Sequence, residues 1–283
     1  MQTRFVGPID SSRGELILDS NPLDRAKIVS GLKTQWASKS LIILDDCAST
    51  NDEVAKVAST AAPEGTVVVA ETQHAGRGRF GRAWYSPRGG LWLSILIKPK
   101  KSPAFIDSLP LIGALGVTKV LTEGWGVKAG VRWPNDVVVD GRKIAGILAE
   151  SKSRGNELAY AALGIGINAN FDVREIKAIR DFSTSLSAIL GRPVDREGLL
   201  VATISEVELL YESVNLTGES VVMGILRKFD WSRGKRIRVR TVDREFIGSF
   251  EDYEDLQKAR INTAEGPQHV EIGTLVSVDY ESD

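Results

Sequence analysis

The chain has 283 residues, a formal net charge of −1 at pH 7, 42% hydrophobic and 26% charged residues. These ordinary values exclude a disordered chain, a collagen and a disulfide scaffold, and the length allows about two domains. The single cysteine cannot form an internal disulfide. No run stays apolar for the ~18 residues that a membrane helix needs, and the first residues lack a signal-peptide pattern. We therefore expect no membrane partner and a cytoplasmic location.

Local patterns along the chain predict alternating strands and helices. Short apolar runs rich in β-branched residues predict strands over residues 41–44, 66–71, 91–98 and 158–168. Helical spacing predicts helices over residues 22–32, from about residue 50 onward, over 104–122 with Pro110 as a kink or break, and over 196–214. Ser49 with Asp52, or Thr50 with Glu53, fits a capping box at the start of the second helix.

A different pattern begins near residue 230. Four short strand-like runs with polar breaks between them cover residues 236–240, 245–250, 258–262 and 274–278. Short strands at this spacing predict a small barrel at the C-terminal end of the chain.

The dipeptide Asp-Gly at 140–141 lies between two apolar runs, which is a strong signal for a two-residue β-hairpin. A regular hairpin would pair Asp136 with Ala145 and would place Lys143 diagonally across from Asp136. Because side chains two apart on a strand share a face, the register brings a cation and a carboxylate together.

The loop GRGRFGR at 76–82 carries the clearest charge signal. No Asp or Glu occurs from residue 72 to 106, whereas seven cations do: Arg77, Arg79, Arg82, Arg88, Lys98, Lys100 and Lys101. The loop matches G-x-G-x-x-G, but a turn and a strand follow it instead of a helix, so we reject a dinucleotide fold. Glycines allow close backbone approach and arginines bind phosphate or carboxylate, which predicts an anion site, with a solvated surface turn as the alternative.

Several single residues remain open between a ligand role and a structural one. Trp84 could stack on a base or pack in the core. The sequence Ser49-Thr50-Asn51 could only cap a helix or could hold a polar head group. With two histidines and one cysteine, a His-rich or thiolate metal site is not expected, and we expect His74 and Cys47 to be structural.

Five sequence blocks, taken together and in order, resemble the biotin–protein ligases from about Gly31 to the end of the chain. They are STN at 49–51, ETQHAGRGRFGR at 71–82, W-x-S-P at 84–87, RWPNDVVVDGRKIAGIL at 132–148 and GIGIN at 164–168. The resemblance implies an α+β fold. Its catalytic domain would be like class II aminoacyl-tRNA synthetases, with a mixed sheet and flanking helices, followed by a small SH3-like barrel. The corresponding division is an N-terminal extension at 1–40, a catalytic domain at 41–229 and a C-terminal domain at 230–283.

The resemblance also implies a reaction in two steps. The carboxylate of biotin attacks the α-phosphorus of ATP and gives biotinyl-5′-AMP and pyrophosphate, with Mg²⁺ as the metal. A lysine of a biotin carboxyl carrier domain then attacks the mixed anhydride and releases AMP. Cations must offset the repulsion between carboxylate and triphosphate, which is the role expected of the loop arginines, Lys143 and Mg²⁺.

Residue roles follow from the same resemblance. The expected catalytic residues are Lys143, Arg79 and Asp136, and Asp136 would orient Lys143, help to place Mg²⁺ or approach the incoming lysine. The expected biotin contacts are Ser49, Thr50, Asn51, Gln73, Arg77, Gly78, Arg79 and Lys143. The expected nucleotide contacts are Arg77, Arg79, Arg82, Trp84, Asn135 and Asn168.

Two departures and two rival functions accompany the resemblance. The family commonly has Lys where this chain has Arg132, which puts a role for a small ammonium there in doubt. About 40 N-terminal residues with one short helical pattern are too few for a winged helix-turn-helix, so we expect a monofunctional enzyme without specific DNA binding. A homodimer stays open. The rival functions are a lipoate–protein ligase and a non-catalytic regulator that binds biotin or nucleotide.

Overall fold

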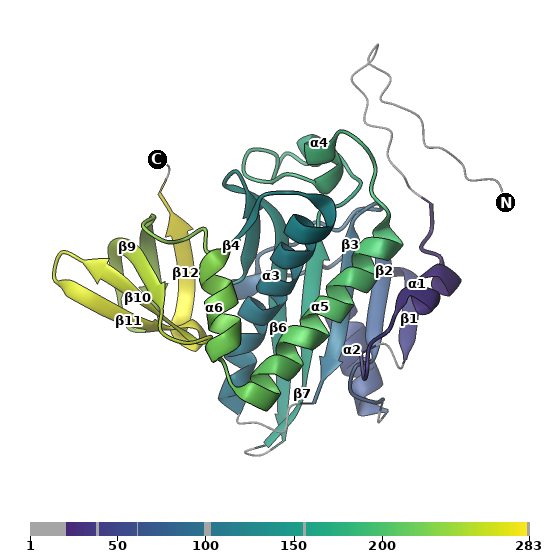
Figure 1. Ribbon diagram of the computed structural model, residues 1–283, viewed down its shortest axis with the longest axis horizontal. Coiled ribbons are helices and arrows are strands. Elements are labelled where there is room, and N and C mark those ends of the chain that lie inside the picture. Colours follow the sequence, from purple (N-terminus) through teal and green to yellow (C-terminus); the bar gives the residue numbers. More distant parts are fainter. Residues whose placement is uncertain (1–20, 38–39, 61, 99–102, 155–156, 282–283) are drawn as a thin grey trace, which may run out of the picture.

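The computed structural model describes residues 21–37, 40–60, 62–98, 103–154 and 157–281. A seven-stranded sheet forms its centre in the order β1-β2-β3-β7-β6-β5-β4, and it is mixed because β1 and β2 are parallel while the other neighbours are antiparallel (Figure 1). Its strands are β1 Leu41–Cys47, β2 Val67–Gln73, β3 Leu91–Ile97, β4 Ala129–Arg132, β5 Asp136–Val139, β6 Arg142–Arg154 and β7 Glu157–Ile167. The four strands expected from the sequence are confirmed.

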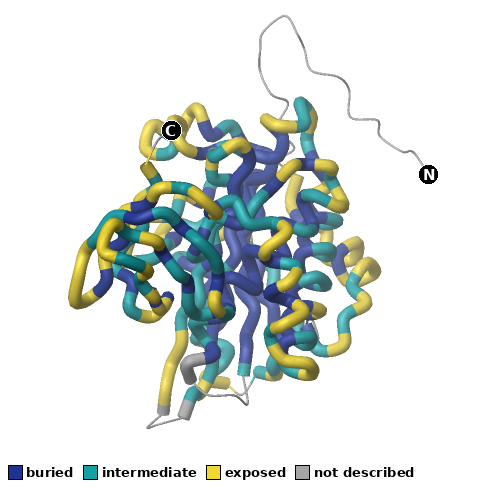
Figure 2. Tube along the Cα trace, turned by 60° about the vertical axis from the view of Figure 1, so that its left-hand side comes forward, coloured by how far each residue is buried: buried dark blue, intermediate teal, exposed yellow. Residues whose placement is uncertain are grey.

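Helices cover both faces of this sheet. They are α1 Arg25–Gly31, α2 Thr50–Ser59, α3 Leu109–Lys119, α4 Leu186–Leu190, α5 Arg196–Thr217 and α6 Ser220–Lys228. The alternation along β2 shows the two sides: Val67 and Val69 join the main core with α3 and α5, whereas Val68 packs with Val54 of α2 on the opposite face. Figure 2 shows the central strands buried beneath exposed loops and helix surfaces. The fold is the α+β arrangement of mixed sheet and flanking helices expected from the sequence.

The segment Phe105–Gly124 is the most apolar helical stretch in the described residues. It is long and apolar enough to cross a membrane, but 78% of it is buried within the protein. It consists of a 3₁₀ turn, α3 and a π-helical turn, and it packs on β6, β4 and α5. Pro110 stands in the first turn of α3, where its missing N–H costs no hydrogen bond, so it marks the start of the α-helix. This is a core helix.

The predicted hairpin forms, with one correction. Asp140 and Gly141 both have positive φ, 49° and 76°, as a type I′ turn requires, and Val138 pairs with Lys143. Beyond that pair the register shifts by a bulge, so Asp136 lies opposite Gly146 and not opposite Ala145. The bulge adds a residue to β6, and Lys143 and Asp136 still meet.

The C-terminal part forms a second, antiparallel sheet in the order β11-β10-β9-β8-β12, consistent with an SH3-like domain (Figure 1). Its strands are β8 Arg236–Thr241, β9 Glu245–Tyr253, β10 Lys258–Thr263, β11 Gly266–Glu271 and β12 Leu275–Tyr280. The sequence patterns missed β11, whose Gly-Pro start and polar residues give no strand signal. The segment before β8 joins the two sheets, because Val131 of β4 exchanges backbone hydrogen bonds with Phe229 and Trp231.

Two local expectations at the N-terminal side have different outcomes. The short helix within 22–32 is confirmed as α1, capped by the Asp24 carboxylate, while residues 1–20 lie outside the described residues. The capping box at α2 is wrong. Ser49 occupies the cap position but its side chain makes no capping hydrogen bond, because the hydroxyls of this segment face a pocket instead.

Candidate active site

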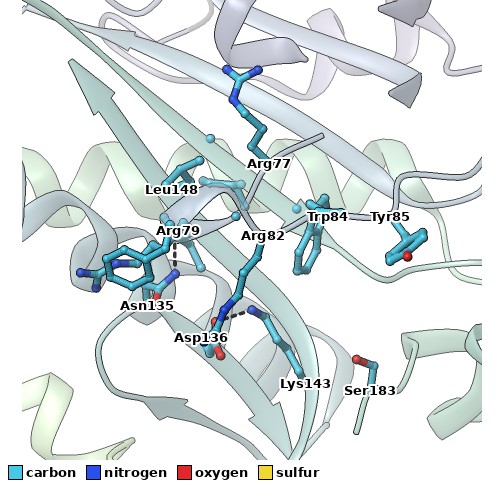
Figure 3. A pocket seen from close by; sticks show the side chains of 18 of the residues that line it. Arg77, Arg79, Arg82, Trp84, Tyr85, Asn135, Asp136, Lys143, Leu148 and Ser183 are labelled. Atoms are coloured by element: carbon cyan, nitrogen blue, oxygen red, sulfur yellow. Dashed lines mark hydrogen bonds and ion pairs between the residues drawn. The ribbon is translucent and has the colours of Figure 1, made fainter. Parts of the chain in front are cut away.

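A pocket of about 750 Å³ lies on the sheet face opposite α3 (Figure 3). It brings together every site residue expected from the sequence: Ser49, Thr50, Asn51, Gln73, Arg77, Gly78, Arg79, Arg82, Trp84, Asn135, Asp136, Lys143 and Asn168. These residues come from the start of α2, the end of β2, the 76–84 loop, the β4–β6 hairpin and the end of β7. The C-terminal sheet adds a wall through β12, with Leu275, Val278 and Tyr280.

Asp136 binds two cations at one end of the pocket. Its Oδ1 lies 2.6 Å from Lys143 Nζ and its Oδ2 lies 2.8 Å from Arg132 Nη2. Burial alone would raise the pKa of the Asp136 carboxyl, but the two cations hold that pKa below its usual value. The backbone of Lys143 is fixed on both sides, donating to the Phe182 carbonyl and accepting from Thr184 N–H. One carboxylate thus holds the Lys143 ammonium at a defined point facing the cavity.

Trp84 forms part of the pocket floor. A Cβ on Gly166 would lie 2.5 Å from the Trp84 Nε1, and one on Gly146 would lie 2.9 Å from the same indole, so the ring rests where these two strands lack side chains. Lys143 Nζ lies 5.0 Å from the indole centre, and Trp92 packs edge-on behind it. The indole N–H is buried without a hydrogen-bond partner. The Trp84 ring is packed against its neighbours and also forms part of the cavity wall. Packing in the core and stacking on a base are therefore compatible roles for Trp84.

The other end of the pocket is polar, and the charge of Arg77 beside it is paired with the carboxylates of Asp52 and Glu150. Gln73 Oε1 accepts from the backbone N–H of Thr50 at 2.8 Å, and Gln73 Nε2 donates to Ser86 Oγ at 2.7 Å. Ser49, Thr50 and Asn51 are buried here at the start of α2. Hydroxyls and an amide supply both donors and acceptors, which suits a neutral polar head group.

The three arginines of the 76–82 loop point in different directions. Arg77 donates to both oxygens of Asp52, at 2.9 and 2.6 Å, and lies 3.2 Å from Glu150, so its side chain extends away from Lys143 (Figure 3). Its hydrogen bond also lowers the pKa of Asp52. Arg79 donates to the Ile272 carbonyl of the C-terminal sheet at 3.1 Å, and burial lowers its pKa. The expected convergence of these arginines on one anion is therefore absent from this conformation.

Arg82 and the lysines of the basic stretch contribute less to the site. Arg82 is exposed and lies 4.0 Å from Asp279. Lys98 donates to the Ala62 carbonyl at 2.6 Å, at the far end of β3 from the pocket. Lys100 and Lys101 lie outside the described residues. The cations of the basic stretch are therefore divided between the pocket loop and the far end of β3.

Known proteins match this arrangement. The model of the biotin/lipoate A/B protein ligase family matches residues 45–168. The bifunctional ligase/repressor BirA of Bacillus subtilis is 32% identical over 268 residues, which are 94% of this chain and 81% of that protein. The chain belongs to the biotin/lipoate A/B protein ligase family.

Individual relatives add detail. The biotin–[acetyl-CoA-carboxylase] ligase of Paracoccus denitrificans is 37% identical over 126 residues, covering 42% of this chain and 50% of that protein. Among solved structures, the biotin protein ligase of Aquifex aeolicus in complex with biotin and ATP superposes with a TM-score of 0.76 at 29% identity, covering 86% of this chain and all of that one. The fold similarity therefore extends well beyond the segment 45–168 that the family model covers.

The two asparagines expected at the nucleotide side are held by backbone carbonyls. Asn135 Nδ2 donates to Ile147 O at 2.8 Å, and Asn168 Nδ2 donates to Thr184 O at 2.9 Å. Both amides are thereby oriented, with their oxygens left for other partners. The structural expectations for His74 and Cys47 agree with the geometry: His74 is exposed and paired with Asp46, and burial raises the pKa of the Cys47 thiol to about 11.

The described residues do not fit a resident magnesium ion. No group of three or more His, Cys, Asp or Glu side chains among them could hold a metal. Asp136, the sequence candidate, already has both oxygens bound to cations. Mg²⁺ prefers several oxygen ligands and is often carried by substrate phosphates. In this family member it fits better as part of the nucleotide substrate than as a protein-held ion.

Several residues of the site have no sequence signal that singles them out. Asp52 and Glu150, which hold Arg77, lie almost 100 residues apart. Tyr280 reaches the site from the last strand, and its ring lies 5.6 Å from the Arg132 guanidinium. Ser94 is the exception, because it is the one polar residue within the apolar sequence of β3. The structure shows that its side chain is fully buried.

Proposed function

We propose that the chain is a biotin–protein ligase that activates biotin with ATP and transfers it to a lysine of a biotin carboxyl carrier domain. One observation carries the proposal: a single pocket joins a neutral donor-and-acceptor end at Thr50 and Gln73 to a cationic end at Lys143. Biotin has the matching polarity, with a neutral ureido ring at one end and a carboxylate at the other. The relatives named above support the same substrates.

The pocket residues account for the first chemical step. The biotin carboxylate oxygen forms a bond to the α-phosphorus of ATP while the bond to the β-phosphate oxygen breaks, and pyrophosphate leaves. Lys143, held by Asp136, stabilises the negative charge that gathers on the α-phosphate oxygens. Trp84 provides an aromatic surface on which adenine can stack, and Asn135 and Asn168 present oriented amides on the nucleotide side.

The second step transfers the acyl group. The amine of the acceptor lysine attacks the carbonyl of the mixed anhydride, the acyl–phosphate bond breaks, AMP leaves, and the new amide loses the amine proton. Residues 41–229 would be the catalytic domain and residues 230–283 the C-terminal domain, while 1–40 would be an extension. A cytoplasmic location, where ATP is plentiful, belongs to the same proposal. No DNA-binding role or oligomeric state is part of it.

Pyrophosphate release tests the proposal against its rivals. The purified chain with ATP and Mg²⁺ should release pyrophosphate when biotin is added and not when lipoate is added, and mass spectrometry should find a biotinylated carrier domain. The opposite preference would assign a lipoate ligase. Lys143→Ala should lower the rate about 100-fold or more while leaving the fold intact, because one transition-state charge stabiliser is lost. A regulator without catalytic activity would release no pyrophosphate in either form.

A further inference from the structure

A run of buried polar side chains leads from Glu150 into the neutral end of the pocket. Asn51 Nδ2 donates to Glu150 Oε2 at 2.7 Å, Ser94 Oγ donates to Asn51 Oδ1 at 2.6 Å, and Thr50 Oγ1 lies 2.7 Å from Ser94 Oγ. Thr50 and Asn51 line the pocket, whereas Ser94 and Glu150 do not. An effect of Ser94 on a ligand must therefore pass through Thr50 or Asn51, while Glu150 can also act through Arg77, with which it is paired.

The first link fixes the orientation of the Asn51 amide. Its nitrogen faces two groups that can only accept, the Glu150 carboxylate and, at 3.5 Å, the Leu148 carbonyl. The Arg77 guanidinium lies 3.2 Å from the same Glu150 oxygen. The Asn51 oxygen must then face Ser94. It lies over Gly164, where a Cβ would stand only 2.6 Å from it.

The second link fixes the direction of the Thr50 hydroxyl. Ser94 has one hydroxyl proton and gives it to Asn51, so in its contact with Thr50 it can only accept. Thr50 must donate, and both lone pairs of its oxygen stay available to the pocket. The other acceptor within reach of the same proton is Gln73 Oε1, at the longer distance of 3.1 Å. If the run were broken, the proton would turn to Gln73 Oε1 and occupy the lone pair that the Thr50 N–H leaves free there.

We propose that Glu150 and Ser94 are positioning residues that hold the Thr50 proton away from Gln73 Oε1 and so keep that oxygen an acceptor for a ureido N–H of biotin. This inference rests on the proposed function and adds a cause of specificity to it. A ureido ring carries two N–H donors, whereas the dithiolane ring of lipoate carries none. A Gln73 oxygen that is kept free before binding favours only the first kind of ligand, since the protein has already met the cost of orienting the Thr50 hydroxyl.

Calorimetry with paired ligands tests the inference. Ser94→Ala should weaken biotin binding by about three- to tenfold, the effect expected of one neutral hydrogen bond. Of the two biotins methylated on one ureido nitrogen, one lacks the N–H that faces Gln73. For that analogue Ser94→Ala should cause almost no further loss, and the KM for ATP should not change. Ser108→Ala is the matched control, because Ser108 is also fully buried and its hydroxyl has no partner.

Variants of Glu150 test the first hydrogen bond of the run, from Asn51 to Glu150. Glu150→Ala frees the Asn51 amide to rotate and should weaken biotin binding like Ser94→Ala. Glu150→Gln keeps an oxygen that can accept from Asn51, so it should retain more affinity. Equal affinities in all variants, or equal losses for biotin and both methylated analogues, would overturn the inference. A wild-type chain that binds no biotin would instead overturn the proposed function.

Discussion

Asp136 shows how one side chain can serve both stability and chemistry. It is 17% exposed and bridges Lys143 and Arg132, which would otherwise bring two like charges together. The usual lysine of the family at position 132 would offer a point charge, whereas Arg132 also lays its flat guanidinium against Tyr280. The exchange therefore keeps the charge and adds a contact to the C-terminal sheet.

Replacing Asp136 by Asn should destabilise the protein at neutral pH. Two cations lose their shared carboxylate, a change that costs roughly 3 kcal/mol in buried pairs. The pKa of Asp136 is lower in the folded protein than its usual 3.8, so its stabilising contribution is complete above that pH and is lost as the pH falls through the folded pKa. The difference in urea unfolding free energy between wild type and Asp136→Asn should accordingly shrink when measured at pH 3 instead of pH 7.

The turn of the same hairpin provides the control for this experiment. Asp140 has φ of 49°, a conformation that Asn adopts at least as readily as Asp. Asp140→Asn removes the same charge from the same hairpin and should leave the unfolding free energy nearly unchanged at both pH values. Equal losses in the two variants would mean that the ion pairs of Asp136 contribute nothing specific.

At the scale of elements, two arginine side chains of the 76–82 loop bind it to other parts of the fold. Arg77 fastens it to α2 and β6, and Arg79 fastens it to the backbone of the C-terminal sheet. Like charges within the loop are thereby separated, so their repulsion does not by itself open the loop. For the loop to close over a ligand, Arg77 must give up its hydrogen bonds to Asp52 and bind the anionic group of the ligand instead.

Arg79→Gly should let the activated intermediate escape. The variant loses the hydrogen bond to Ile272 and gains backbone freedom. We expect free biotinyl-AMP to accumulate in solution and to biotinylate bystander lysines, both measurable by chromatography and mass spectrometry. Ala83→Gly, which adds a glycine to the same loop segment without removing a side chain that packs on Arg79, should retain the intermediate. Leakage from both variants alike would show that loop flexibility matters and the Arg79 contact does not.

The elements that the sequence predicts well are those set by neighbours in the chain. The Asp140-Gly141 turn and the buried strand β3 depend on local turn chemistry and local apolar pattern. The bulge beyond Lys143 is not predicted, because the chemistry of the Asp140-Gly141 turn by itself leads to a regular two-residue hairpin. The partners of Arg77 and Arg79 are not predicted either, because Glu150 and Ile272 reach them only through the tertiary fold. Site membership was predictable from motifs, but side-chain direction was not.

At the scale of the whole molecule, the C-terminal sheet is part of the active site. Tyr280 Oη donates to the Trp133 carbonyl at 2.9 Å and contacts Ser232 Oγ at 2.7 Å, while Ser232 accepts from Trp133 N–H. These bonds clamp the turn that separates Arg132 from Asp136. A change in the second sheet can therefore reach Lys143 through Arg132 and Asp136.

Tyr280→Phe isolates this connection. The ring under Arg132 stays, but the Trp133 carbonyl and Ser232 lose their partner, which should cost about 1–2 kcal/mol of unfolding free energy. We expect kcat for pyrophosphate release to fall several-fold while the Kd for biotin stays constant, because the neutral end of the pocket is untouched. Tyr211→Phe is the matched control: it removes a tyrosine hydroxyl on α5 that donates to Glu64, outside the network of Ser232 and Trp133. Equal kcat values in the two variants would confine the role of Tyr280 to stability.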